Sequence, residues 1–261
     1  DVGPMDRMTT PAQLGAIDYA NDYGFRYVRS HSCVRNPPIY SEDETGAPVY
    51  DWSEFDRRID AIVDLGMWPV ICLEGTPPEI ATGDEGKNWR NYYPPKGDEG
   101  YRRWQQICHE MVAHCVERYG NDVHNWLFEV WNEPNSSGYF AGTLEDYLRI
   151  YDHGVEGATS ADPAVKIGGP AAAGVGWTRE LLEHCSKGTN YATGGTGTRI
   201  DYLSWHVYTV SVGLPSFERL REHTQTPLTC LQDFPEYADL PTVITEWGCS
   251  SSPSSFHDRP Y

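Results

Sequence analysis

The chain has 261 residues, and its 38 acidic against 20 basic side chains give a formal net charge of −18. Such an acidic chain, with no cluster of Lys and Arg, is a poor match for nucleic acid, because a polyanion is bound by basic surface that displaces its counterions. Its apolar runs are far shorter than the roughly 18 residues of a membrane helix, so no membrane contact is predicted. The 39% hydrophobic and 13% aromatic content is typical of a folded globular chain. At this length the chain could form either one large α/β barrel or two smaller domains.

Helical and extended patterns then alternate along the chain. A capping box at residues 10–13 opens a predicted helix that runs to Ala20. An aromatic and β-branched stretch at 25–31 predicts the first strand, and helical spacing over 55–63 predicts the next helix. The nearly uninterrupted apolar run at 67–73 predicts a strand covered on both faces. The remaining predicted elements are a helix at 101–119, a strand at 125–131, a helix at 144–158, a strand at 164–169, a helix at 177–185, a strand at 202–208, a weaker helix at 216–223 and a strand at 242–247.

The helix at 101–119 contains a sequence that looks like a metal site. His109, Glu110 and His114 form H-E-x-x-x-H, one residue longer than the zinc-protease motif. At about 100° per residue, this spacing turns the two imidazoles roughly 140° apart. We therefore predict that these side chains lie on a solvated polar face and hold no metal.

The seven cysteines are spread along the chain without a CxxC pair. Their odd number fits neither a disulfide framework nor a zinc site, so we expect free, largely buried thiols. The first residue is not Met and no signal-peptide core follows it, so the compartment is left open. The oligomeric state is left open as well.

The alternation of strands and helices predicts a parallel α/β sheet with right-handed crossovers, as in a barrel or an open doubly wound sheet. No GxGxxG fingerprint follows the first strand, and the glycine-rich stretch at 194–197 precedes a strand, on the wrong side for a phosphate cradle. We therefore expect no nucleotide cofactor. Because no long linker interrupts the pattern, residues 1–261 are interpreted as a single domain.

Two predicted strands lead into a glutamate. Glu133 follows the strand at 125–131, and Glu246 lies near the end of the strand at 242–247. The carboxyl ends of parallel strands meet at one rim of the sheet, where active sites are built. Either glutamate alone would also fit a salt bridge that closes a loop. As a pair, one with a raised pKa and one kept ionised, they fit cleavage of a glycosidic bond.

The residues around these glutamates resemble a known family. FEVWNEPN at 128–135 and ITEWG at 244–248 look like the two catalytic signatures of clan A glycoside hydrolases. Within that clan the chain most resembles family 39, the β-xylosidase and α-L-iduronidase family, with further matches in GFRYVRSH at 24–31 and WHVY at 205–208. The resemblance implies a retaining double displacement on a (β/α)8 TIM barrel, without metal or cofactor, acting on an oligosaccharide or glycoside.

By motif position, the resemblance implies a role for each site residue. Glu133 would be the general acid/base and Glu246 the nucleophile. Asn132 would bind the sugar 2-hydroxyl, while Tyr208 would steady the ionised nucleophile. Arg29 would be the positive neighbour that lowers the pKa of Glu246.

Three further residues each have two alternative roles in this scheme. His31 and His206 would bind sugar hydroxyls or support residues that do. Trp247 would stack under the sugar ring, with a core aromatic as the alternative. The match fails after the strand at 67–73, where the expected acid is shifted or replaced by Glu74, so no sugar contact is assigned there.

The favoured activity is release of terminal xylose-like sugars from plant-type oligosaccharides. An α-L-iduronidase-like activity ranks below it, because the negative charge is poorly suited to polyanionic glycosaminoglycans. A sugar-binding barrel without turnover is the third alternative. Only six strands are predicted, matching family strands 2 to 7, so we expect a piece of a longer barrel, truncated at both ends.

Overall fold

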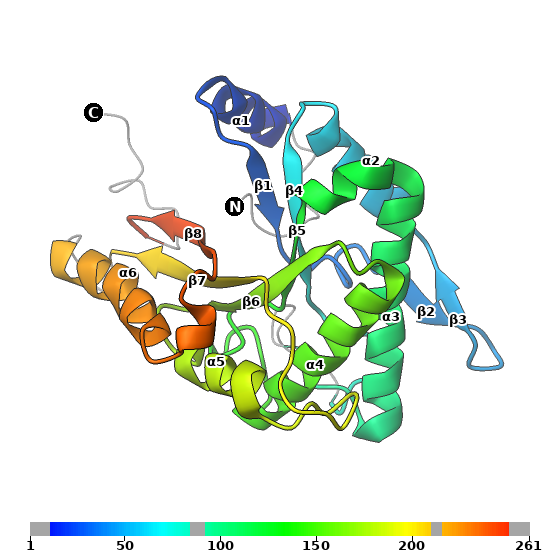
Figure 1. The fold of residues 1–261 in the computed structure, drawn as a ribbon. Coiled ribbons are helices and arrows are strands. Elements are labelled where there is room, and N and C mark those ends of the chain that lie inside the picture. Colours follow the sequence, from blue (N-terminus) through cyan, green and yellow to red (C-terminus); the bar gives the residue numbers. More distant parts are fainter. Residues whose placement is uncertain (1–10, 84–91, 210–215, 251–261) are drawn as a thin grey trace.

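The computed structural model describes residues 11–83, 92–209 and 216–250. Six strands form one parallel sheet in the order β1-β4-β5-β6-β7-β8, with β1 and β8 as its edges in the described part of the chain (Figure 1). The strands are β1 (Tyr27–Ser30), β4 (Trp68–Leu73), β5 (Leu127–Val130), β6 (Lys166–Ala172), β7 (Tyr202–Tyr208) and β8 (Thr242–Gly248). The predicted parallel α/β arrangement with six strands is confirmed.

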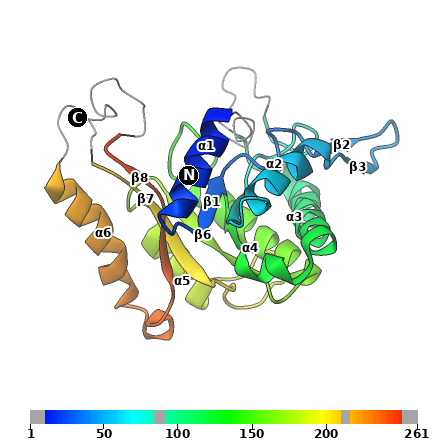
Figure 2. The same cartoon turned by 90° about the horizontal axis from the view of Figure 1, so that it is seen from above.

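The helices cover the outer face of this curved sheet (Figures 1 and 2). Helices α2, α4, α5 and α6 contact strands β4, β5, β6 and β7 respectively, as helical connections between parallel strands do. The helices are α1 (Pro11–Asp22), α2 (Ser53–Val63), α3 (Gly97–Tyr119), α4 (Leu144–Ala161), α5 (Thr178–Lys187) and α6 (Phe217–Leu231), with 3₁₀ turns η2 (Gly120–Asn125) and η3 (Pro235–Tyr237).

The largest core lies between the sheet and helices α3 and α4. The predicted apolar face of α3 is buried as expected, with Trp104, Ile107 and Met111 fully enclosed. Helix α4 starts at a capping box in which Thr143 and Asp146 satisfy each other's backbone N–H groups. Strand β4 is buried from its second residue onward, which confirms a strand covered on both faces.

The structure departs from the sequence-based elements at several points. An antiparallel hairpin of β2 (Tyr40–Glu42) and β3 (Pro48–Tyr50) was not predicted, because three-residue strands carry too little periodicity. Strand β1 is shorter than predicted. Helix α6 continues to Leu231, past Pro227 and well beyond the predicted end at residue 223. The capping residue expected at Thr10 lies outside the described residues.

The two histidines of the H-E-x-x-x-H sequence point to different neighbours, as their spacing predicts. His109 Nδ1 lies 3.0 Å from Ser160 Oγ on α4. His114 Nε2 lies 2.6 Å from an oxygen of Asp56 on α2. The two imidazoles therefore cannot share one metal ion in this conformation.

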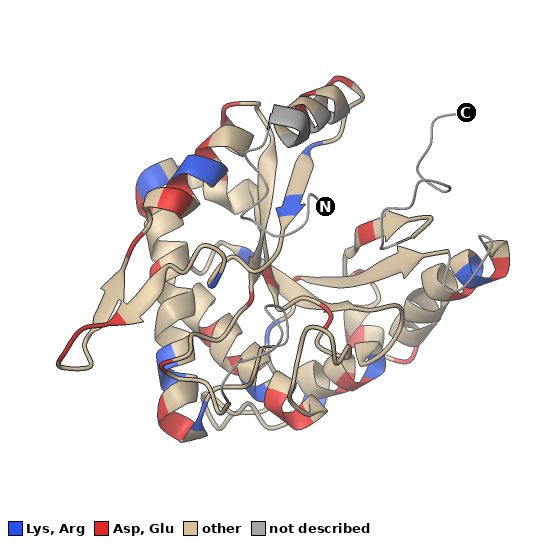
Figure 3. Cartoon of the chain, turned by 180° about the vertical axis from the view of Figure 1, so that it is seen from behind, with Lys and Arg blue, Asp and Glu red and all other residues tan. Residues whose placement is uncertain are grey.

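The remaining surface features are simple. Six of the seven cysteines are buried and Cys249 is exposed, all as free thiols. No helix in the described residues is both long and apolar enough to cross a bilayer. Figure 3 shows Lys and Arg interspersed with Asp and Glu over the face that it presents.

Candidate active site

Two glutamates that are far apart in sequence meet at the carboxyl ends of the strands. A carboxylate oxygen of Glu133, one of Glu246 and a ring nitrogen of His206 all lie within 4.8 Å of one another. His206 on β7 pairs in register with Glu246 on β8, while Glu133 follows β5. The sheet therefore brings together the two carboxylates that the sequence singles out.

The turn after β5 carries backbone strain. Trp131 has φ +73° and Glu133 has φ +46°, in the left-handed region that costs about 1–3 kcal/mol per non-glycine residue. Hydrogen bonds to the neighbouring strand ends hold this turn: Trp131 N donates to Leu73 O at 3.0 Å, and Glu133 N donates to Ala171 O at 2.9 Å. The surrounding sheet thus fixes the strained turn that presents the Glu133 carboxylate.

Glu246 is held as an ionised carboxylate. Arg29 Nη1 donates to its Oε1 at 2.8 Å, and Tyr208 Oη donates to its Oε2 at 2.7 Å. Burial alone would raise the pKa of Glu246, but the charges of His206, Arg29 and His31, together with the Tyr208 hydrogen bond, lower that pKa to about 2. Its carboxylate therefore stays charged at any ordinary pH.

Arg29 is itself fixed by a second buried carboxylate, which sequence reasoning missed. Its Nε donates to Glu129 Oε2 at 2.6 Å, and its Nη2 donates to Asn132 Oδ1 at 2.9 Å. Glu129 is fully buried and also accepts a hydrogen bond from Cys72 Sγ at 3.2 Å. The available signal was a single charged residue inside the apolar run WLFEVW, since a buried carboxylate requires a buried cation.

His206 lies between the two carboxylates. Its Nδ1 is 2.9 Å from Glu133 Oε1 and 3.6 Å from Glu246 Oε2. The side chain is fully buried, which favours holding the carboxylates over binding sugar hydroxyls directly. Asn132 Nδ2 and His206 Nε2 are both buried without a hydrogen-bond partner among the described residues, which leaves two polar atoms of the site to be satisfied.

His31 and Glu74 form a separate buried contact at the ends of β1 and β4. His31 Nδ1 lies 3.2 Å from Glu74 Oε2 and 3.2 Å from Ser32 Oγ. The same carboxylate oxygen accepts a hydrogen bond from Ser32 N at 2.5 Å. Glu74, the acid at which the sequence departs from the family pattern, thus orients the His31 ring.

Trp247 is not brought into this site. Strands β7 and β8 shift register so that Thr245 is an extra residue in β8. This bulge places Ile244 and Trp247 together on the outer side of the sheet, beside α6 and away from Glu246. Because Trp247 is 70% exposed there, its position supports neither the expected stacking platform nor the alternative of a core aromatic.

Among the described residues, one group has ligand atoms close enough together to hold a metal ion. This group is Glu133, His206 and Glu246. The contacts favour proton chemistry at this place. Arg29 already supplies a permanent positive charge at 2.8 Å from Glu246, and a metal cation there would face that guanidinium. The geometry therefore gives no reason to add a metal.

A parallel β/α sheet whose strand ends bring two carboxylates this close is the arrangement found in barrel glycoside hydrolases. The model of glycosyl hydrolases family 39 matches residues 4–261, and the chain belongs to this family.

Relatives of known structure and name agree with this assignment. The chain is 31% identical to a β-xylosidase from Caldicellulosiruptor saccharolyticus, over 92% of this chain and 50% of that protein. It is 29% identical to an α-L-iduronidase from Canis lupus familiaris, over 92% of this chain and 35% of that protein. The crystal structure of a monomeric β-xylosidase from Caulobacter crescentus CB15 matches with a TM-score of 0.80 and 27% identity, over 96% of this chain and 52% of that one. The barrel fold type is confirmed, and the chain spans about half or less of these relatives' length.

Proposed function

We propose that this chain carries the active site of a retaining exo-glycosidase that removes xylose-like sugars from plant-type oligosaccharides. The observation that carries the proposal is the carboxylate pair, with oxygens of Glu133 and Glu246 within 4.8 Å. Retaining glycosidases hold their two carboxyl groups about 5–5.5 Å apart, whereas inverting enzymes need about 6.5–9.5 Å to admit a water molecule. The observed spacing supports retention.

The different surroundings of the two carboxylates support different roles. In the proposed first step, protonated Glu133 gives its proton to the glycosidic oxygen while Glu246 attacks the anomeric carbon, which forms a glycosyl ester and releases the alcohol. In the second step, Glu133 removes a proton from water, and the resulting attack frees the sugar and Glu246. The low pKa of Glu246 suits a nucleophile that is ionised in the resting enzyme.

Three neighbouring residues complete the proposed mechanism. The unpartnered Nδ2 of Asn132 is available to bind the sugar 2-hydroxyl, a contact that strengthens in an oxocarbenium-like transition state. Arg29 and Tyr208 hold the Glu246 carboxylate through one oxygen each, which fixes its direction of attack.

The choice of sugar rests on the relatives. Two β-xylosidases match at 30–31% identity, and an α-L-iduronidase at 29% is the basis of the second candidate. A panel of nitrophenyl glycosides that includes β-xyloside and α-L-iduronide separates the two. We expect the xyloside to give the highest kcat/KM. Turnover of the iduronide alone would contradict the choice of sugar, and binding without turnover of any member would contradict the enzyme proposal.

Variants of the carboxylates test the roles. Glu246→Gln removes the nucleophile, and we expect kcat to fall by about 10³-fold or more. Glu133→Ala should lose activity most on substrates with poor leaving groups, and added azide should restore turnover as a glycosyl azide of retained configuration. The matched control is Glu99→Gln, an exposed glutamate on α3 that pairs with Arg102. Unchanged activity in Glu246→Gln, or an inverted product, would refute the mechanism.

A further inference from the structure

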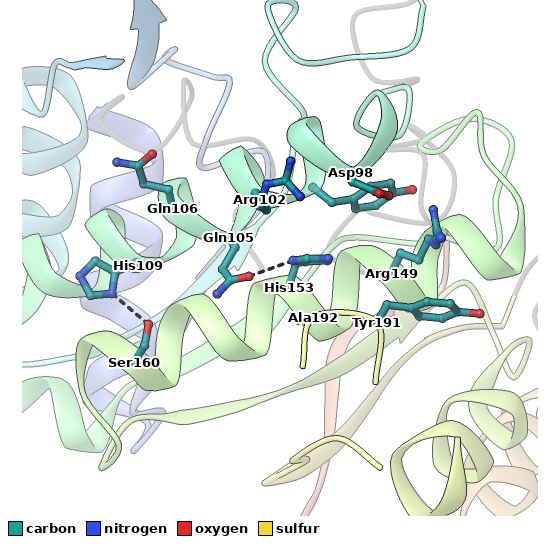
Figure 4. A pocket seen from close by; sticks show the side chains of 11 residues that line it. Asp98, Arg102, Gln105, Gln106, His109, Arg149, His153, Ser160, Tyr191 and Ala192 are labelled. Carbon is teal, nitrogen blue, oxygen red and sulfur yellow. Dashed lines mark hydrogen bonds between the residues drawn. The ribbon is translucent and has the colours of Figure 1, made fainter. Parts of the chain in front are cut away.

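A groove of about 670 Å³ lies on the outside of the barrel, between α3, α4 and the loop that follows α5 (Figure 4). None of the residues that line it belongs to the carboxylate site. Its volume is within the roughly 300–1,000 Å³ of small-molecule sites. Side chains from both helices line it: Gln105, Gln106 and His109 from α3, and Arg149, His153 and Ser160 from α4.

Arg149 lines this groove and has no hydrogen-bond acceptor among the residues that the structure describes. The carbon at the centre of its guanidinium lies 5.0 Å from the ring centroid of Tyr191 and 5.5 Å from that of Tyr101. Its Nε is buried with no hydrogen-bond partner, and none of the described residues forms an ion pair with it. Two aromatic rings thus preorganise a planar fork of donors, the geometry that matches a carboxylate.

The other groups in the groove suit a ligand with hydroxyl groups more than a bare anion. His153 Nδ1 contacts Gln105 Oε1 at 2.9 Å, and the Gln105 amide NH₂ and His153 Nε2 have no hydrogen-bond partner among the described residues. Burial lowers the pKa of His153, so its ring is neutral at pH 7 and Nε2 is an acceptor. Gln106 accepts from Arg103 and keeps its own NH₂, and Asp98 adds acceptor oxygens. A sulfate ion accepts hydrogen bonds only, so its site needs donors alone, whereas sugar hydroxyls both donate and accept and so need donors and acceptors together.

We propose that this groove is a second binding site, for an oligosaccharide that includes a carboxylate-bearing sugar. Arg149 binds the carboxylate, and Gln105, Gln106 and His153 bind hydroxyls of the same or the next sugar. The groove holds no pair of carboxylates that could cleave the ligand. It anchors an acidic branch of a polysaccharide on the outside of the barrel, away from Glu133 and Glu246.

Calorimetry with two matched probes tests this site. The probes are xylotriose with a glucuronic acid branch and unbranched xylotriose, titrated into the full chain with Glu246→Gln to prevent hydrolysis. We expect the acidic probe to show a binding component whose Kd rises at least about 10-fold when Arg149→Gln is added. The neutral probe should bind at this site at least about 10-fold more weakly than the acidic probe. Adding Asn132→Ala instead, in the carboxylate site, should leave this component unchanged.

Further variants keep the test independent of folding and of catalysis. Arg149→Lys keeps the positive charge but removes the planar guanidinium. Its Kd for the acidic probe should lie between those of the Arg149 protein and Arg149→Gln. Arg57→Gln, an exposed arginine on α2, is the charge-matched control. If Arg149→Gln lowers the thermal midpoint, the exposed Gln106→Ala replaces it and should weaken the acidic probe about three-fold or more. Absence of an Arg149-dependent component, or sulfate binding as tightly as the acidic probe, would overturn the inference, whatever glycoside the chain hydrolyses.

Discussion

Glu246 stays charged although most of its surface is buried. Its two oxygens each accept a hydrogen bond, one from Arg29 and one from Tyr208. The charges of His206, Arg29 and His31, together with the Tyr208 hydrogen bond, outweigh the effect of burial on its pKa. The Arg29 side chain is fixed in position because Glu129 and Asn132 accept hydrogen bonds from its other N–H groups. At the scale of single residues, the site is a chain of charge-assisted hydrogen bonds that ends on the proposed nucleophile.

The Tyr208 hydroxyl should therefore control the acidic end of the activity profile. Tyr208→Phe removes a donor that lowers the pKa of Glu246, so that pKa rises from about 2, by roughly one unit. A carboxylate is ionised above its pKa, so the acidic limb of kcat/KM against pH should move to higher pH. The control is Tyr237→Phe, on η3 away from the carboxylates. A limb that stays in place in Tyr208→Phe would show that another group governs it.

At the scale of elements, α3 and α4 pack closely enough to require a glycine. A Cβ atom added to Gly157 on α4 would lie 2.2 Å from Gln105 O and 3.0 Å from Cys108 Cβ on α3. One added to Gly154, a turn earlier, would meet Val130 at 3.4 Å, an ordinary contact. The periodicity of each helix is readable in the sequence, but which glycine lies at the crossing depends on how the two helices meet.

The two glycines therefore form a matched pair of stability tests. We expect Gly157→Ala to lower the free energy of unfolding by about 1–3 kcal/mol, because α3 must move away from α4. Gly154→Ala should be neutral or stabilise by up to about 1 kcal/mol, because alanine restricts the unfolded chain. Urea denaturation measures both. Equal effects of the two substitutions would contradict the packing described here.

At the scale of the whole molecule, a net charge of −18 acts on stability through self-repulsion. The thermal midpoint should therefore rise by a few degrees as sodium chloride increases from about 10 to 200 mM, because salt screens exposed charges. Differential scanning calorimetry measures the shift. A fall in the midpoint would mean that exposed ion pairs contribute more than the net charge costs.

Much of this molecule follows from local sequence. The periods of the apolar residues specify the order of strands and helices, and strand ends in a parallel sheet place Glu133 and Glu246 on one rim. These features depend on spacings of a few residues, which a single chain displays directly. The hairpin β2–β3 and the far end of α6 were missed, because very short strands and a proline inside a helix give weak or misleading local signals.

Only the tertiary structure decided which side chains contact one another in the site. The ion pair between Glu129 and Arg29 joins residues on different strands. The bulge at Thr245 decides on which side of the sheet Trp247 lies. The groove at Arg149 likewise needs two helices and a loop in contact. Such contacts depend on register and on long-range packing, for which periodicity within one segment carries no information. The net charge of −18 disfavours polyanionic partners in general terms, while the fold sets the places where a charged group is bound.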